Sequence, residues 1–273
     1  MSEKNRAGKI YLIIVFALLY APIFYLMYYS FNSGGNMHEF EGFTLEWYSE
    51  VFHDTRLIII VINTLVIALL SSVIATIIGI VGALAIDRIR RKRVKNTILS
   101  LNNVLIVSPD VIIGASFLIL FTIAGIQLGF TSVLLSHIAF SVPIAVLMIL
   151  PRLQEMSPTL VDAARDLGAS RRDVLTKVII PFISPAIFSA FFMALTYSLD
   201  DFAVTFFVTG SGYTTLSVEI YSRARAGVSL SINALSTLIF LITTALVVGY
   251  YLVSKGNLRR RGKEPASEMG VPR

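Results

Sequence analysis

Long apolar runs alternate with short polar stretches along this 273-residue chain. Six of the runs reach the roughly 20 residues that a helix needs to cross a bilayer. The pattern therefore predicts an all-α, polytopic membrane protein in which residues 1–273 form a single transmembrane domain. The six predicted spans lie at about 10–31, 57–86, 98–125, 130–150, 182–209 and 232–253.

The basic residues of the chain gather in alternate polar stretches. If the N-terminus is cytoplasmic, all but three of the 23 Lys and Arg residues fall on the cytoplasmic side. Because cytoplasmic loops of membrane proteins carry an excess of Lys and Arg, this distribution predicts a multi-pass membrane protein with both termini in the cytoplasm. The basic run at 88–95 is interpreted as a topology signal that contacts anionic membrane lipid, not as a nucleic-acid-binding patch.

Composition removes several classes of function. The chain is 55% hydrophobic and 15% charged, with a mean hydropathy of +0.76, which is far from the average of soluble proteins. It has no cysteine and three histidines, so we expect neither a disulfide framework nor a metal site. The sequence contains no P-loop motif, so we expect no ATP site of that kind. We also expect no cofactor and no catalytic residue. Energy for any transport would have to come from a partner.

A polar segment, residues 151–181, separates the fourth and fifth predicted spans. Ser157 can cap a first short helix that begins at Pro158, and Gly168 suits the left-handed position that ends a helix. A second start signal, S-x-x-D, begins at Ser170. On this pattern alone, the segment is either an amphipathic connector on the membrane surface or a docking element. The apolar face of the first helix consists of Leu160, Val161, Ala164 and Leu167.

Two other polar segments lie between spans on the predicted outer side. Residues 32–56 carry five carboxylates against one Arg, and residues 44–52 have the pattern of a short amphipathic helix. Trp47 and Tyr48 of this helix either anchor it at the membrane interface or dock a partner. Residues 210–231 are too polar to span and too apolar for a flexible linker, so we expect a structured loop. The docking candidates are Trp47, Tyr48, Glu219 and Tyr221.

Three carboxylates fall within the predicted spans, Asp110 in the third and Asp200 and Asp201 in the fifth. Each costs on the order of 2.5–3.5 kcal/mol at bilayer depth, so each must face a cavity or pair with a cation. No Lys or Arg lies in the six spans, so such a cation would come from a partner subunit. Tyr197 lies one helical turn before Asp201, and a carboxylate beside an aromatic ring is a natural ammonium site. Pro109 is expected to disrupt the helix next to Asp110.

The same residues leave two other functions open. A proton-coupled secondary transporter could use the three acids as proton carriers, but it should show inverted repeats, and none is evident. An intramembrane hydrolase could use Asp200 and Asp201 as acid and base. Neighbouring residues on a helix point about 100° apart, so these two cannot face each other, and only one of them is expected to face a pore. His137, in the fourth span, is interpreted as a hydrogen bonder between packed helices rather than a proton relay.

The spacing within residues 151–181 resembles the coupling loop of ABC importer permeases, whose pattern is E-A-A-x3-G-x9-I-x-L-P; we call these residues the coupling segment. Here Asp replaces Glu, Val replaces Ile and Ile replaces Leu, and each change keeps the charge sign or the apolar character. In that family the loop forms coupling helices that dock in a groove on the ATPase subunit. The seven matching positions are Asp162, Ala163, Ala164, Gly168, Val178, Ile180 and Pro181.

Four further stretches resemble the permease subunits of spermidine/putrescine ABC importers. The likeness implies a type I importer permease fold in the bacterial inner membrane, together with a second homologous permease, two ATPase subunits and an external polyamine-binding protein. It also implies ATP-driven polyamine import, with weak ammonium contacts to Asp110, Tyr197, Asp200 and Asp201. Related permeases move iron, sulfate or thiamine; acids in the path argue against sulfate, so iron and thiamine remain alternatives. The four stretches are SPDVIIGASFLILF (108–121), GIQLGF (125–130), SLDDF (198–202) and VEIYSRARAGVSLSINAL (218–235).

Overall fold

The computed structural model describes residues 3–227 and 230–261, and these residues form helices joined by loops. Within them, extended pairing is limited to one isolated antiparallel bridge between Asn32 and Phe43. The all-α prediction is therefore confirmed. The chain packs as two compact units, one made of Met1–Thr55 and Arg223–Arg273 and the other of Arg56–Ser222.

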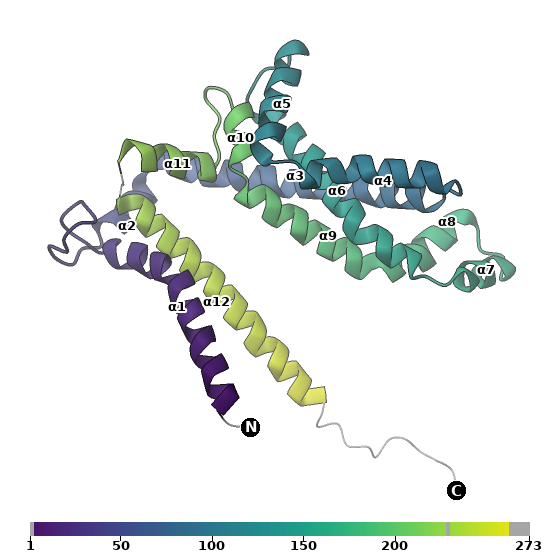
Figure 1. The fold of residues 1–273 in the computed structure, drawn as a ribbon, viewed down its shortest axis with the longest axis horizontal. Helices are drawn as coiled ribbons and strands as arrows, with labels where there is room; N and C mark the ends of the chain where they lie inside the picture. Colours follow the sequence, from purple (N-terminus) through teal and green to yellow (C-terminus); the bar gives the residue numbers. More distant parts are fainter. Residues whose placement is uncertain (1–2, 228–229, 262–273) are drawn as a thin grey trace, which may run out of the picture. The chain divides into compact units, whose positions relative to one another are not determined.

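The first unit contains α1 (Glu3–Tyr29), α2 (Glu46–His53) and α12 (Leu230–Arg261), and α12 packs against both of the others (Figure 1). The loop between α1 and α2 is organised around the buried side chain of Asn32. Its amide nitrogen donates to the carbonyls of Asn36 and Glu39, both at 2.8 Å, and its oxygen accepts from the Glu41 backbone at 2.8 Å. The loop between α1 and α2 is therefore folded, and hydrogen bonds to the side-chain amide of Asn32 hold it together.

The second unit is built around α6, which has its most extensive contact with α9. Helix α3 also lies tightly against α6: a Cβ added at Gly79 would sit 2.5 Å from the Cβ of Ala145. Such close approach needs small residues, as is usual between helices in membranes. The elements that lie wholly or mostly in this unit are α3 (Thr55–Asp87), α4 (Lys92–Val107), α5 (Asp110–Ile123), α6 (Phe130–Gln154), α7 (Pro158–Asp166), α8 (Arg171–Asp173), the π-helix η1 (Val174–Ile179), α9 (Ile180–Asp200), α10 (Ala203–Val208) and α11 (Leu216–Ala226).

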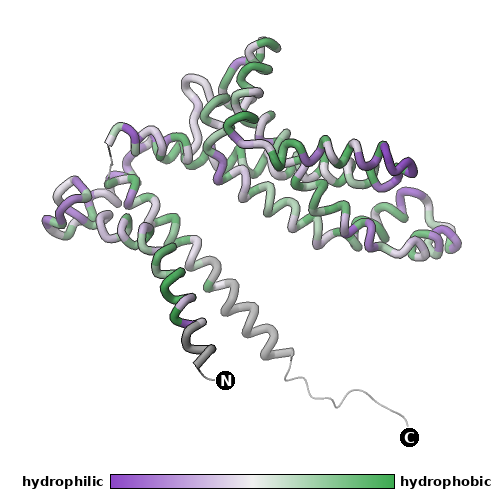
Figure 2. The backbone as a smooth tube through the Cα atoms, viewed as in Figure 1, coloured by the Kyte–Doolittle hydropathy of each residue, from purple (hydrophilic) through white to green (hydrophobic). Residues whose placement is uncertain are grey.

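Four of the predicted spans correspond to helices that are long and apolar enough to cross a membrane. Figure 2 shows the hydrophobic colouring along much of these helices and the hydrophilic turn between α3 and α4. The predicted last span, 232–253, lies within α12, whose apolar stretch among the described side chains is Leu230–Ala245. The four long helices are Gly8–Tyr29, Thr55–Asp87, Phe130–Gln154 and Arg171–Asp200.

The structure differs from the prediction in the third span, 98–125, which is not one continuous helix. Helices α4 and α5 meet at an angle of 104°. Pro109 separates them because it has no backbone N–H and disfavours a helical conformation in the residue before it, and Ser108 is extended (φ −71°, ψ 142°). The predicted fifth span, 182–209, also breaks, since α9 ends at Asp200 and α10 is a separate helix.

Most of the helix signals in the coupling segment are confirmed. Pro158 begins α7, Gly168 has a φ of +83°, and the Ser170 hydroxyl accepts from the backbone N–H of Asp173. Ser157 precedes α7, but its hydroxyl bonds to that of Thr159 at 2.7 Å instead of capping the helix. The second helix also differs from the prediction, because α8 continues through η1 into α9 without a break.

Candidate functional site

Asp110 begins α5 at the break in the third span, and its side chain is exposed. Across from it on α9, the hydroxyl of Tyr197 donates to Asp110 Oδ1 at 3.4 Å. Both residues line a cavity of about 130 Å³, which we call the Asp110 cavity. The pairing predicted for Tyr197 was with Asp201, one turn along the same helix, but the structure brings Tyr197 to Asp110 instead.

The rest of the Asp110 cavity is apolar or aromatic. Ile113, Met193 and Val204 contribute to its walls, and Phe140 packs edge-on against Tyr197 with ring centroids 5.4 Å apart. A single carboxylate in such surroundings has few competing donors, so a cation entering the cavity gains both ion pairing and the faces of aromatic rings. The chemistry of the cavity therefore suits an organic cation better than an anion.

Asp201 lies in different surroundings, because its carboxylate is turned into the protein and only 6% exposed. Its Oδ2 accepts from the backbone N–H of Thr205 at 2.8 Å and from the Thr205 hydroxyl at 2.6 Å, and its Oδ1 accepts from the Val204 N–H at 3.3 Å. These are the unpaired N–H groups at the start of α10, which an Asp side chain commonly satisfies. The structure thus gives Asp201 a helix-capping role, whereas its neighbour Asp200 is exposed.

His137 completes this buried network from α6. Its Nδ1 lies 2.6 Å from the hydroxyl of Ser198 on α9, and its Nε2 lies 2.8 Å from the hydroxyl of Thr205 on α10 and 3.6 Å from Asp201 Oδ2. Ser198 in turn bonds to Ser71 of α3 at 3.1 Å. The interpretation of His137 as a hydrogen bonder between packed helices is confirmed. Sequence reasoning missed Ser198 and Thr205, although the Asp201–Thr205 spacing of four residues was a usable signal.

The coupling segment projects from the second unit with much of its surface open. None of the residues of α7 is buried, and Asp162 forms an ion pair with Arg165 at 3.6 Å. The predicted apolar face divides: Val161 and Ala164 are half-buried, while Leu160 and Leu167 are exposed, Leu167 by 90%. Of the seven positions that match the family pattern, Asp162, Ala163, Gly168 and Pro181 are exposed, and Ala164, Val178 and Ile180 are half-buried.

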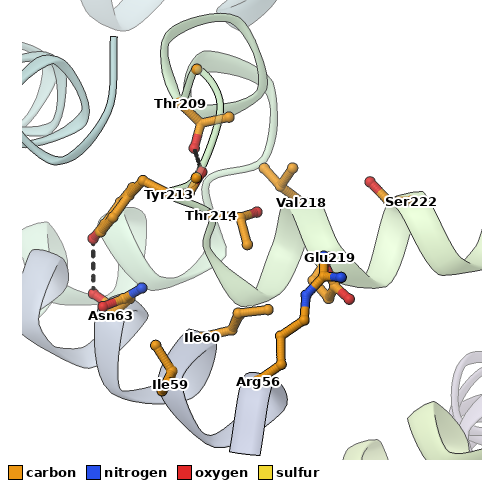
Figure 3. Close-up of a pocket in the computed structure, with 12 residues that line it drawn as sticks. Arg56, Ile59, Ile60, Asn63, Thr209, Tyr213, Thr214, Val218, Glu219 and Ser222 are labelled. Carbon is orange, nitrogen blue, oxygen red and sulfur yellow. Dashed lines mark hydrogen bonds and ion pairs between the residues drawn. The ribbon is translucent and has the colours of Figure 1, made fainter. Parts of the chain in front are cut away.

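A larger pocket of about 580 Å³ lies between the start of α3, the 209–214 loop and α11 (Figure 3). Arg56 and Glu219 form an ion pair there at 3.2 Å, with Arg56 73% exposed and Glu219 only 7% exposed. Tyr213 lines the same pocket, and burial raises the pKa of its phenol to about 12. We call this cavity the Arg56 pocket; Arg56, not the predicted Glu219, presents its charge to the solvent.

The other docking candidates, like Glu219, form contacts within the protein that cover part of their side chains. Trp47 donates its indole N–H to the Asn32 carbonyl at 2.7 Å, and the Tyr48 hydroxyl bonds to that of Ser30 at 2.7 Å. Both side chains are half-buried and close the loop between α1 and α2. The ring of Tyr221 packs at a tilt against that of Phe202, with centroids 4.5 Å apart, and Tyr221 remains 39% exposed. Of the four predicted residues, Tyr221 has the most side chain available to a partner.

Several apolar helices with an exposed polar segment between two of them form the fold of a polytopic membrane protein. Solved membrane subunits of ABC transporters share this fold. The fold aligns with a bacterial ABC transporter involved in the import of the acidic polysaccharide alginate, with a TM-score of 0.67 and 18% identity over 95% of this chain and 98% of that one. It also aligns with the MetNI methionine ABC transporter in an inward-facing conformation, with a TM-score of 0.58 and 19% identity over 73% of this chain and 95% of that one.

Sequence comparison then gives the family. Residues 75–258 match the family of binding-protein-dependent transport system inner membrane components, and the chain belongs to that family. It is 37% identical to the spermidine/putrescine transport system permease protein PotC of Shigella flexneri, over 91% of this chain and 94% of that protein. It is 34% identical to the putrescine transport system permease protein PotI of Escherichia coli (strain K12), over 91% of each. The chain is therefore a permease subunit of an ABC importer.

Proposed function

We propose that this permease passes polyamines, spermidine or putrescine, through the membrane and that the Asp110 cavity forms part of their path. The observation that supports this proposal most directly is the single exposed carboxylate of Asp110. It lies 3.4 Å from the Tyr197 hydroxyl, in a cavity with otherwise apolar and aromatic walls. The substrates named for the PotC and PotI relatives agree with this chemistry.

The cavity chemistry matches the structure of a polyamine, in which ammonium groups are separated by methylene chains. Asp110 can pair with one ammonium group while the Phe140 and Tyr197 rings contact it and the neighbouring methylenes. One carboxylate gives a weak site, and a transport path needs sites from which the substrate can leave. The exposed Asp200 offers a second contact, so that an ammonium group moves between acids instead of crossing the apolar region alone.

We propose the following partners and orientation. A second homologous permease completes the pathway, two ATPase subunits bind on the cytoplasmic side, and an external polyamine-binding protein delivers the substrate. The excess of basic residues on one side supports an inner membrane location with both termini in the cytoplasm. The 32–56 and 210–231 segments dock the binding protein. Arg56 is the exposed contact at the end of the first segment, and Tyr221 is the exposed contact of the second.

The coupling segment is proposed to transmit ATPase movement through the seven residues that match the family pattern. The exposed Leu160 and Leu167 support this role, because apolar side chains on a polar segment stabilise a contact only when a partner covers them. Continuity from α8 through η1 into α9 supports it too, since a displacement of the segment would act directly on the helix that carries Tyr197.

Transport of labelled spermidine tests the substrate. The chain is expressed with its partner subunits in cells that lack polyamine importers, and uptake is followed with and without this subunit. ATP-dependent uptake that requires this chain is the expected result. If a fully assembled complex takes up no polyamine but takes up iron or thiamine, the substrate proposal is wrong. Uptake that survives ATP depletion but collapses with a protonophore would instead indicate a proton-coupled carrier.

A charge placed on the exposed face of α7 tests the coupling role. Leu167→Glu should leave folding unchanged, because the side chain is 90% exposed, while ATP-dependent uptake falls about tenfold as the contact with the ATPase is lost. The matched control is Asn96→Glu, which adds the same charge at an exposed position outside the coupling segment. Equal uptake by the two variants at equal assembly would contradict the assignment.

A further inference from the structure

A third cavity, of about 310 Å³, lies at the base of the coupling segment. Its walls come from the last turns of α3 and α6, from α7 and from the α8–η1 helix, all within the second unit. Three arginines line it, Arg88 after α3, Arg165 on α7 and Arg171 on α8, and we call it the arginine cavity. The Asp110 cavity and the Arg56 pocket share no residue with it.

The positive charge of the arginine cavity is only partly balanced. Arg165 pairs with Asp162 at 3.6 Å, and Asp87, the one acid in the lining, lies 3.9 Å from Lys95. In the part of the chain that the structure describes, no carboxylate lies within 4 Å of the charged nitrogens of Arg88 or Arg171. Two guanidinium groups that face one cavity without an acidic partner favour an anion there.

The residues that line the cavity indicate which kind of anion it would bind. Guanidinium groups present a planar set of donors that matches phosphate oxygens, and several can share one phosphate. Apart from the three arginines and Asp87, the lining is apolar: Leu153 and Val174 are buried, and Leu84 and Ile179 also contribute. A free hydrated ion gains nothing from apolar walls, whereas the glycerol and first methylenes of a phospholipid would cover them.

We propose that the arginine cavity binds the phosphate headgroup of an anionic phospholipid from the adjacent leaflet, which is the cytoplasmic leaflet in the proposed orientation. A phosphate held by Arg88 and Arg171 joins the end of α3 to the start of the helix that continues into α9. The lipid thereby braces the coupling segment against the transmembrane helices. Basic pockets between helices on the cytoplasmic side are a known physical solution for binding such headgroups.

The test compares two charge-matched variants of the assembled transporter. Arg88→Gln with Arg171→Gln removes the two guanidinium groups of the cavity, and Arg90→Gln with Arg93→Gln removes two exposed arginines of the neighbouring basic run that do not line it. Phosphatidylglycerol retained by each purified complex is counted by native mass spectrometry. ATP hydrolysis is measured in phosphatidylcholine vesicles with and without phosphatidylglycerol.

The cavity variant should bind phosphatidylglycerol at least about tenfold more weakly than the control, since each lost charged hydrogen bond weakens binding by about that factor. Its ATPase activity should also lose its response to phosphatidylglycerol. Equal retention and equal response in both variants would overturn the proposal, as would a coupling defect in the cavity variant with lipid retention intact, which would assign the cavity to an acidic protein partner.

A second experiment distinguishes binding of a phospholipid from binding of soluble phosphate. The lipid-depleted complex is heated in detergent with inorganic phosphate or with phosphatidylglycerol, and the unfolding midpoint is followed. Protection by phosphatidylglycerol alone supports a lipid site, whereas equal protection by inorganic phosphate overturns the lipid assignment. If the double variant does not assemble, the single Arg171→Gln variant, at an exposed position, is measured in the same way.

Discussion

Asp110 and Asp201 both stand at a break in a predicted span and near the start of a short helix, yet their carboxylates have different surroundings. Asp201 accepts three hydrogen bonds from Val204 and Thr205, while the described partner of the Asp110 side chain is the Tyr197 hydroxyl at 3.4 Å. The same residue type therefore caps a helix at one break and stays available at the other. An acid at membrane depth becomes a candidate for transport only when its oxygens are not already used by the fold.

The largest expected effect comes from removing the buried acid. Asp201→Ala removes the carboxylate that accepts hydrogen bonds from the first N–H groups of α10 and from the Thr205 hydroxyl and that lies beside His137. Removing one partner from such a buried polar network should lower the free energy of unfolding by about 3–5 kcal/mol. We expect a lower thermal unfolding midpoint of the detergent-solubilised complex, or loss of assembly. Asp200→Ala, at the exposed neighbour, is the control and should change stability by about 0.5 kcal/mol or less. Equal destabilisation by the two variants would remove the distinction between the acids.

The next effect in size concerns His137. His137→Ala removes one hydrogen bond each from Ser198 and Thr205, which keep their bonds to Ser71 and Asp201, and two lost hydrogen bonds should together cost about 1–3 kcal/mol. The unfolding midpoint of the complex should fall, while uptake per folded complex changes little. Loss of uptake at wild-type stability would instead support a proton relay through His137 and would reopen the secondary-transporter alternative.

A smaller effect is expected at the aromatic partner of the exposed acid. Tyr197→Phe keeps the ring but removes the hydroxyl that contacts Asp110, which is worth about 1 kcal/mol, or roughly a fivefold rise in the KM for spermidine uptake. Tyr11→Phe, at an exposed position on α1, is the matched control. A change in maximal rate with KM unaltered would indicate that the hydroxyl acts on conformational movement and not on the substrate.

The smallest expected effect is the change in stability when Asp110 itself is replaced. Asp110→Ala removes an exposed side chain, so the free energy of unfolding should change by about 0.5 kcal/mol or less, and the unfolding midpoint should move little. This result, set beside Asp201→Ala, would separate an acid kept for function from one kept for structure. A loss as large as that of Asp201→Ala would mean that Asp110 also belongs to the folding machinery.

The sequence predicts the helical class well because long apolar runs and helix start signals depend on local chemistry. Pro158, Gly168 and Ser170 mark their helix boundaries through backbone effects that need no tertiary partner. The role of Asp201 was not predictable in the same way. Its i, i+4 partner Thr205 lies in a run whose hydropathy suggested one continuous span, and the break between α9 and α10 is what turns the carboxylate toward the N–H groups.

Other features depend on packing that local patterns do not encode. The position of Pro109 predicts a disruption, but the 104° angle between α4 and α5 follows from what each helix packs against. The π-helix η1 has no sequence signal comparable to a cap or a proline. The meeting of Asp110 and Tyr197, 87 positions apart in the sequence, likewise requires the arrangement of α5 and α9 around α6.

Spermidine uptake by the Asp110→Asn variant tests the central claim most directly. The substitution keeps the size of the side chain and removes its charge, and the assembled complex is compared with wild type at equal expression and equal unfolding midpoint. A fall of about tenfold, with most of the uptake kept by Asp110→Glu, is the predicted result for a carboxylate that pairs with ammonium groups in the path. Wild-type uptake by Asp110→Asn would contradict the account.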